Sequence, residues 1–133
     1  MAAQSFSARE VLTAFLDTVA GNDADKIAAW FAEDAVYTNV QTPPLVGRDA
    51  IREMFAKIAS RASGMRWDIV SAGYSDTTGW LERVDHFWMG EHQVSIECNG
   101  VFVVDPERGL ITEVRDYVDF ATYRERLAAA TGA

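Results

Sequence analysis

The feature that most constrains the fold is a series of four long strand-like runs in the second half of the chain. The runs are Met65–Tyr74, Trp80–Met89, His92–Val104 and Leu110–Phe120. Short turn signals separate them, at Gly79, at Gly90-Glu91 and at residues 105–109. Long consecutive strands joined by tight turns usually pair with their neighbours along the chain, so this half of the sequence predicts a β-meander.

The remaining elements are mostly helices. Ser7 has capping-box spacing to an acidic residue three positions later, ahead of apolar residues at helical intervals. Asp23 can cap a short second helix that includes Phe31, and a third helix is predicted to begin at residues 47–49. A last helix is expected at about Thr122–Ala130, after the strands.

One further strand, Ala35–Val40, lies between the helices and is followed by Pro43-Pro44, which cannot donate to a strand ladder. Helices followed by a meander are typical of an α+β domain with its helices on one face of a curved sheet. The length of 133 residues suits one domain, expected to span residues 1–133.

The net charge of −8 argues against nucleic acid or an anionic membrane as the main partner, since both favour Lys and Arg. No stretch approaches the roughly 20 apolar residues that a membrane span needs, and the start lacks a basic segment followed by an apolar run. A cytoplasmic location is the simplest expectation. The single cysteine, Cys98, rules out an intrachain disulfide.

The run from Trp80 to Phe87 carries charges on a face that is otherwise apolar. Alternate strand residues point to opposite faces, so Arg83 and Asp85 share a face with Leu81 and Phe87. An unpaired buried charge is costly, so an arginine and an aspartate in this position require partners.

Hairpin register suggests such a partner on a neighbouring strand. A two-residue turn at Gly90-Glu91 places Asp85 opposite Ile96 and Arg83 opposite Cys98. If Val104 faces Leu110 across the next loop, Cys98 lies opposite Asp116. The Arg83 guanidinium would then pass over the small Cys98 and bridge two carboxylates.

This combination favours acid/base chemistry. Two carboxylates in a desolvated pocket cannot easily both ionise, so one can donate a proton while the other accepts one. Tyr37 and Asn39 share one face of their strand, and a phenol and an amide can hold a water molecule in a defined direction.

At these residues the sequence resembles the limonene-1,2-epoxide hydrolase family of the SnoaL-like/NTF2-like superfamily. The matching pieces are Tyr37-Thr38-Asn39, Glu82-Arg83-Val84-Asp85 and Arg115-Asp116-Tyr117, within a likeness that runs from about Val11 to Leu127. The resemblance implies a cone-shaped fold, with helices packed on the concave face of a strongly curved mixed sheet.

The resemblance also implies a role for each site residue. Asp85 would protonate the epoxide oxygen, Asp116 would deprotonate water, and Arg83 would hold both carboxylates. Tyr37 and Asn39 would position the water, which attacks directly and gives a vicinal diol without a covalent intermediate. The implied partners are a small-molecule epoxide, water and a second copy of the chain, bound through the outer face of the sheet.

By resemblance and by face, the walls of the substrate pocket are expected to be Leu16, Val19, Ile58, Phe87, Ile96, Val118 and Tyr123. The family often has tryptophan before its Arg-Asp-Tyr motif and phenylalanine after it, where this chain has Val114 and Val118. Together with Cys98, these differences are expected to reshape the pocket and to change the substrate more than the chemistry.

Other kinds of site have weaker support. His86 and His92 lack metal-ligand spacing, so neither a metal nor a cofactor is predicted. Cys98 lacks a partner base and is interpreted as an inert thiol.

Two alternatives to epoxide hydrolysis stay open: a ketosteroid-isomerase-like or polyketide-cyclase-like enzyme on the same fold, and a non-catalytic binding module. The tryptophans are assigned to the core or an interface: Trp30, Trp67, Trp80 and Trp88.

Overall fold

The computed structural model describes residues 5–132, which form four helices and six strands. In chain order these are α1 (Ala8–Val19), α2 (Ala24–Ala28), β1 (Phe31–Asn39), β2 (Leu45–Val46), α3 (Arg48–Arg61), β3 (Gly64–Tyr74), β4 (Thr78–Met89), β5 (His92–Asp105), β6 (Leu110–Val118) and α4 (Phe120–Thr131). None of the helices in this part of the chain is long and apolar enough to cross a membrane.

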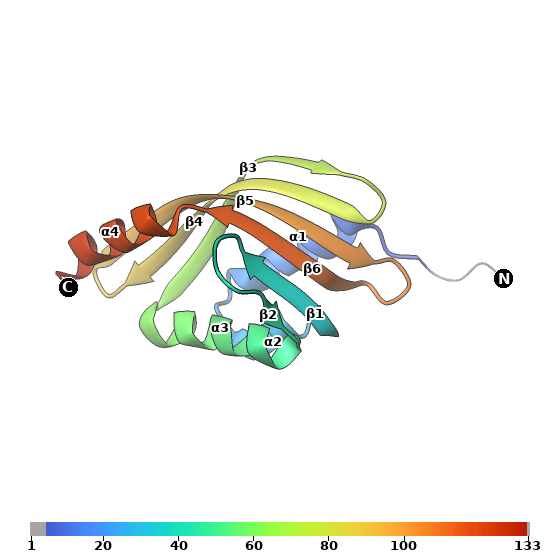
Figure 1. The fold of residues 1–133 in the computed structure, drawn as a ribbon, viewed down its shortest axis with the longest axis horizontal. Helices are drawn as coiled ribbons and strands as arrows, with labels where there is room; N and C mark the ends of the chain where they lie inside the picture. The colour runs from blue at the N-terminus through green and yellow to red at the C-terminus, as the bar shows by residue number, and fades with distance from the viewer. Residues whose placement is uncertain (1–4, 133) are drawn as a thin grey trace.

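The six strands form one curved, unclosed sheet in the order β2-β1-β6-β5-β4-β3. Strands β3 to β6 are the predicted antiparallel meander, and β1 joins them by pairing parallel to β6. Helices α1, α2 and α3 lie together on one side of the sheet, and α4 extends from the end of β6 (Figure 1). The predicted α+β class and mixed curved sheet are therefore confirmed.

Helix capping follows the sequence signals. The Ser7 side chain accepts a hydrogen bond from the Glu10 backbone N–H, and the Asp23 side chain accepts from two N–H groups at the start of α2. The prediction that Phe31 belongs to this second helix was wrong. Helix α2 ends at Ala28, because Phe31 pairs with Ile111 of β6 and starts β1.

The last strand also ends earlier than predicted. It stops at Val118, and Phe120 is the first residue of α4 rather than the end of the strand. Asp119 explains the change of structure, because its side chain accepts a hydrogen bond from the Thr122 backbone N–H and so caps the helix.

The predicted register is correct between β4 and β5 and wrong between β5 and β6. Arg83 pairs with Cys98 as expected, but Asp116 pairs with Gly100 instead of Cys98. Leu110 pairs with Asp105 and not with Val104 as predicted, which shifts the register by one residue. An irregularity at Val103/Val104 shifts it by one more. The total offset is two residues, so Asp116 keeps its face because strand side chains alternate with period two.

The core between the helices and the sheet is rich in aromatic rings. Phe15 of α1 meets Phe31 at a centroid separation of 5.6 Å, and Phe55 of α3 meets Tyr37 at 6.1 Å. All four rings are nearly inaccessible to solvent. This packing covers the inner end of the concave face, where β4, β5 and β6 bring the predicted polar residues together.

Candidate active site

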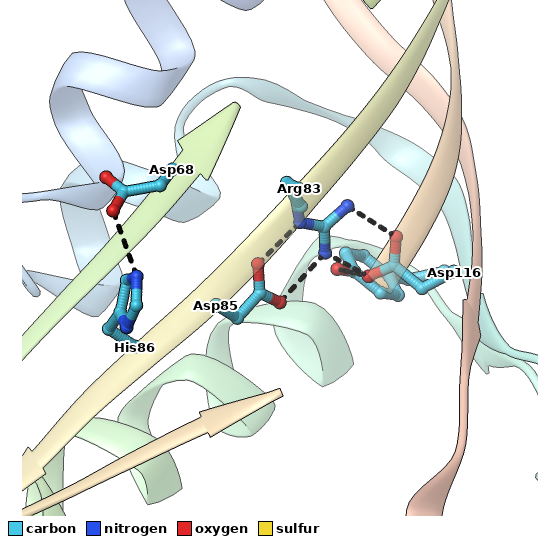
Figure 2. Close-up of polar contacts among 6 residues, drawn as sticks. Asp68, Arg83, Asp85, His86 and Asp116 are labelled. Atoms are coloured by element: carbon cyan, nitrogen blue, oxygen red, sulfur yellow. Dashed lines mark hydrogen bonds and ion pairs between the residues drawn. The ribbon is translucent and has the colours of Figure 1, made fainter. Parts of the chain in front are cut away.

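Arg83 joins the two predicted carboxylates through four hydrogen bonds (Figure 2). Its Nε and Nη2 donate to Asp85 at 2.7 and 3.2 Å. Its Nη1 and Nη2 donate to Asp116 at 2.9 and 2.8 Å. Both carboxylates are thus held in two-point contacts, which fix direction as well as distance. We call Arg83, Asp85 and Asp116 the clamp.

The clamp spans three strands, and Gly100 on the middle strand makes room for it. A Cβ atom on Gly100 would lie 2.5 Å from Arg83 Nη1 and 2.5 Å from Asp116 Oδ1. Contacts that short do not occur, so a side chain there would displace the guanidinium or the carboxylate. The guanidinium therefore crosses β5 beside Gly100 and not, as the sequence predicted, over Cys98.

All three members of the clamp are buried, with exposed fractions of 1% for Arg83, 6% for Asp85 and 3% for Asp116. Burial raises the pKa of Asp85 from 3.8 to about 6, although the Arg83 charge and its hydrogen bonds act in the opposite direction. The Asp116 charge adds to the rise. One guanidinium balances one carboxylate, so a proton on Asp85 removes the remaining buried charge.

Tyr37 and Asn39 reach the clamp from β1. The Tyr37 hydroxyl donates to Asp116 Oδ2 at 2.5 Å, and burial together with the Asp116 charge raises the pKa of this phenol well above its usual value. Asn39 pairs with Asp116 in the β1–β6 ladder, and its Nδ2 contacts Met54 Sδ at 3.7 Å. Like Tyr37, it lines the cavity described below. The structure thus brings all five predicted catalytic residues to one end of the concave face.

A cavity of about 430 Å³ opens beside the clamp. Asp85 and Asp116 line this cavity, whereas Arg83 lies behind them and does not. Five of the seven predicted pocket residues line it: Ile58, Phe87, Ile96, Val118 and Tyr123. Leu16 and Val19 do not. Val19 belongs to the hydrophobic core and Leu16 packs against it, because the face of α1 that carries them is directed at that core.

The fold and this geometry agree with the comparison to known proteins. The family model of the SnoaL-like domain matches residues 12–114 of the chain. The chain belongs to the SnoaL-like domain family. The match covers most of the helices and strands described above, including the clamp residues Arg83 and Asp85.

Solved structures show which SnoaL-like proteins are similar. An LEH-like epoxide hydrolase of M. tuberculosis is 28% identical, with a TM-score of 0.76 over 92% of this chain and 90% of that one. A putative SnoaL-like polyketide cyclase of Shewanella denitrificans has a TM-score of 0.78 at 13% identity, over 91% and 96%. The epoxide hydrolase/cyclase-like enzyme SalBIII of salinomycin pyran ring formation has a TM-score of 0.69 at 22% identity, over 85% and 91%. The last two support the fold alone.

Several residues of the SnoaL-like cavity were not foreseen from the sequence. Strand β3 contributes Met65 and Trp67, which lie on one face by simple alternation. That signal was present in the sequence, but choosing the face required the register with β4. Other residues join the wall from α3, α4, β2 and the β1–β2 connection: Thr42, Pro43, Leu45, Ala50, Glu53, Met54, Phe55, Lys57 and Phe120.

The other face of the SnoaL-like sheet carries a separate polar chain. His86 contacts Asp68 of β3 at 2.9 Å (Figure 2). It also contacts Ser95 of β5 at 2.7 Å. This placement confirms that His86 points away from Asp85. Among residues 5–132 no group of three or more His, Cys, Asp and Glu side chains could hold a metal ion.

Cys98 lies in the cavity wall as a buried thiol. Burial raises its pKa, and the neighbouring carboxylates act in the same direction. The sulfur is therefore held in its protonated, weakly nucleophilic form. In this position Cys98 contributes a small apolar surface to the cavity.

Proposed function

We propose that this SnoaL-like protein is an epoxide hydrolase that adds water to a small apolar epoxide, terpene-like or cyclic, to give a vicinal diol in one step. The observation that carries the proposal is the clamp: one arginine holds two carboxylates with different hydrogen-bond environments at the wall of a mainly apolar cavity. The 28% identity to an LEH-like epoxide hydrolase supports the same reaction class.

Asp116 is the base in this proposal. It accepts hydrogen bonds from Arg83 and Tyr37, so its carboxylate is oriented and its charge is compensated. Because the Tyr37 hydroxyl donates its hydrogen bond to Asp116, its oxygen is free to accept a hydrogen bond from water. Tyr37 and Asn39, which both line the cavity, would direct this water at the epoxide carbon while Asp116 takes its proton.

Asp85 is the acid. With a pKa raised to about 6, it carries a proton over a wider pH range than an ordinary aspartate and can donate it to the epoxide oxygen. The water oxygen bonds to carbon, the carbon–oxygen bond of the ring breaks, and the alkoxide receives the Asp85 proton. Return of a proton from Asp116 to Asp85 closes the cycle, and no cofactor is needed.

The alternative is another acid/base enzyme on the same fold, of the ketosteroid-isomerase or polyketide-cyclase type. Such an enzyme needs a carboxylate base and neutral donors for a developing oxyanion. Asp116 and Tyr37 could be used in that way. Arg83 donates two hydrogen bonds to each carboxylate and so holds one acid and one base on opposite sides of the same cation. This arrangement favours hydrolysis over the alternative reactions.

Isotope labelling tests the reaction and its one-step course together. Purified protein is incubated with limonene oxide or cyclohexene oxide in water enriched in heavy oxygen, with enzyme in excess for a single turnover. Direct attack by water gives diol carrying one heavy oxygen. Unlabelled diol in the first turnover indicates a covalent carboxylate ester instead, and no diol from a broad epoxide panel favours the alternative enzyme class.

We also propose that the protein forms a homodimer through the outer face of its sheet. Val70, Trp80 and Tyr117 have exposed fractions of 62%, 48% and 50%, high for large apolar side chains. Light scattering coupled to size-exclusion chromatography gives the mass directly. Trp80→Glu is expected to shift the species toward half that mass, whereas a monomeric wild-type protein contradicts the proposal.

A further inference from the structure

Trp67 connects the hydrophobic core to the clamp. Its ring lies against the Arg83 guanidinium, whose central carbon is 3.9 Å from the ring centroid. A cation within about 6 Å of an aromatic face is attracted to it, most strongly where water is excluded. Trp67 is also the cross-strand partner of Asp85 in the β3–β4 ladder. One side chain thus contacts the cation and borders the acid.

Other rings fix Trp67 in place. Phe15 meets it at a centroid separation of 5.8 Å, Phe55 at 6.3 Å and Phe102 at 6.4 Å. Phe102 also lies 5.7 Å from the guanidinium carbon of Arg83. With 8% of its surface exposed, the indole cannot turn aside without displacing these neighbours.

The polar group of the indole does not explain its presence. Trp67 Nε1 is buried without a hydrogen-bond partner, an arrangement that carries a desolvation cost. What the site uses is the flat face of the ring. The carboxylates of Asp85 and Asp116 fix the guanidinium within its own plane, whereas a ring stacked on it opposes movement out of that plane.

We propose that Trp67 is a positioning residue: its ring fixes the plane of the Arg83 guanidinium and covers Asp85, so that the clamp presents its acid and base in one geometry. The role rests on the proposed function, because it concerns the acid and base of that reaction. It assigns to Trp67 a task beyond filling the core or the cavity wall.

The partnerless indole N–H provides a matched pair of variants. Trp67→Phe keeps an aromatic face and loses the partnerless N–H together with one of the two rings, whereas Trp67→Ala removes the face and admits water. Val104→Ala, which shortens a buried core residue of β5 outside the cavity wall, controls for loss of stability. Trp67→Leu replaces the alanine variant if that protein does not fold.

The first measurement does not depend on activity. Carbon-13 NMR of the Asp85 carboxyl group follows its titration in each variant. Because burial is the largest cause of the raised pKa, we expect the midpoint to fall from about 6 by about half a unit or more in Trp67→Ala. Trp67→Phe and Val104→Ala should keep the wild-type midpoint. An unchanged or raised midpoint in Trp67→Ala overturns the proposal.

The second measurement is the pH profile of epoxide hydrolysis. We expect kcat of Trp67→Ala to fall about tenfold to a hundredfold, as for a small misplacement of catalytic groups, with a smaller change in KM. Its alkaline limb should move to lower pH, and Trp67→Phe should keep the limb in place. Equal loss in Val104→Ala contradicts a positioning role. If the wild-type protein forms no diol, the proposed function fails while the NMR titration still tests Trp67.

Discussion

Gly100 is the residue whose substitution most directly tests the geometry of the clamp. It lies on β5 opposite Asp116, at the point where the Arg83 guanidinium crosses from β4 to β6. Gly100→Ala adds one methyl group. In most strand positions such a change is tolerated or mildly stabilising, since glycine weakens a strand.

Here the added carbon has no room. It would lie 2.5 Å from Arg83 Nη1 and Asp116 Oδ1 and 2.6 Å from Phe102 Cε1, about 1 Å inside the favourable separation of roughly 3.5 Å. Phe102 is fully buried and cannot yield easily. Separating Arg83 from Asp116 leaves a buried charge unpaired, which costs on the order of 3–5 kcal/mol. A 1 Å displacement of the catalytic groups lowers the rate by about 10²-fold.

The assay compares Gly100→Ala with Gly73→Ala, because a Cβ on Gly73 of β3 would meet no atom within 4 Å. Urea unfolding gives the free energy of unfolding of each variant, and diol formation gives kcat/KM. We expect a large loss of both for Gly100→Ala and near wild-type values for Gly73→Ala. Wild-type stability and kcat/KM in Gly100→Ala would refute the reasoning that the clamp needs this gap.

Three further predictions concern the clamp. First, kcat/KM falls as pH rises above about 6, because the acid Asp85 must be protonated in the free enzyme; a rate that is flat from pH 5 to 8 contradicts this. Second, the raised pKa of Asp85 contributes stability that is complete only well below its unfolded pKa of 3.8 and is lost as pH rises through about 6. Relative to Asp85→Asn, wild-type protein should therefore lose about 2 kcal/mol of unfolding free energy between pH 4 and pH 8 in urea titrations. Third, Tyr37→Phe lowers kcat by about 10- to 100-fold, because the water loses an acceptor and Asp116 loses a donor, and circular dichroism should show an unchanged fold.

The strand elements and the inward direction of the proposed catalytic residues could be predicted because they depend on alternation alone. Arg83 and Asp85 lie two residues apart, so any pairing that buries one buries the other. Asp116 stayed on the correct face although its predicted partner was wrong by two residues. An offset of one residue would have turned it to the outer face.

What could not be predicted depends on contacts between distant elements. Gly100 has no local signal in the sequence, since the Asp105–Leu110 pairing at the loop and the irregularity at Val103/Val104 together bring it opposite Asp116. Trp67 was assigned to the core or an interface because nothing near it in sequence indicates Arg83 beneath its ring. Leu16 and Val19 follow the apolar pattern of a pocket wall as well as that of a core, and only the packing of α1 distinguishes the two.

The charge balance of the clamp couples stability to chemistry. With both carboxylates ionised, one guanidinium leaves a net negative charge in a site that is largely buried, and the protein reduces this cost by holding a proton on Asp85. That proton is the one the proposed reaction delivers to the epoxide oxygen. The desolvation that destabilises the ionised clamp therefore also keeps Asp85 protonated, and available as a proton donor, closer to neutral pH. A change that hydrates the site, at Trp67 for example, should relieve the folded state of that cost and also lower the fraction of Asp85 that is protonated near neutral pH.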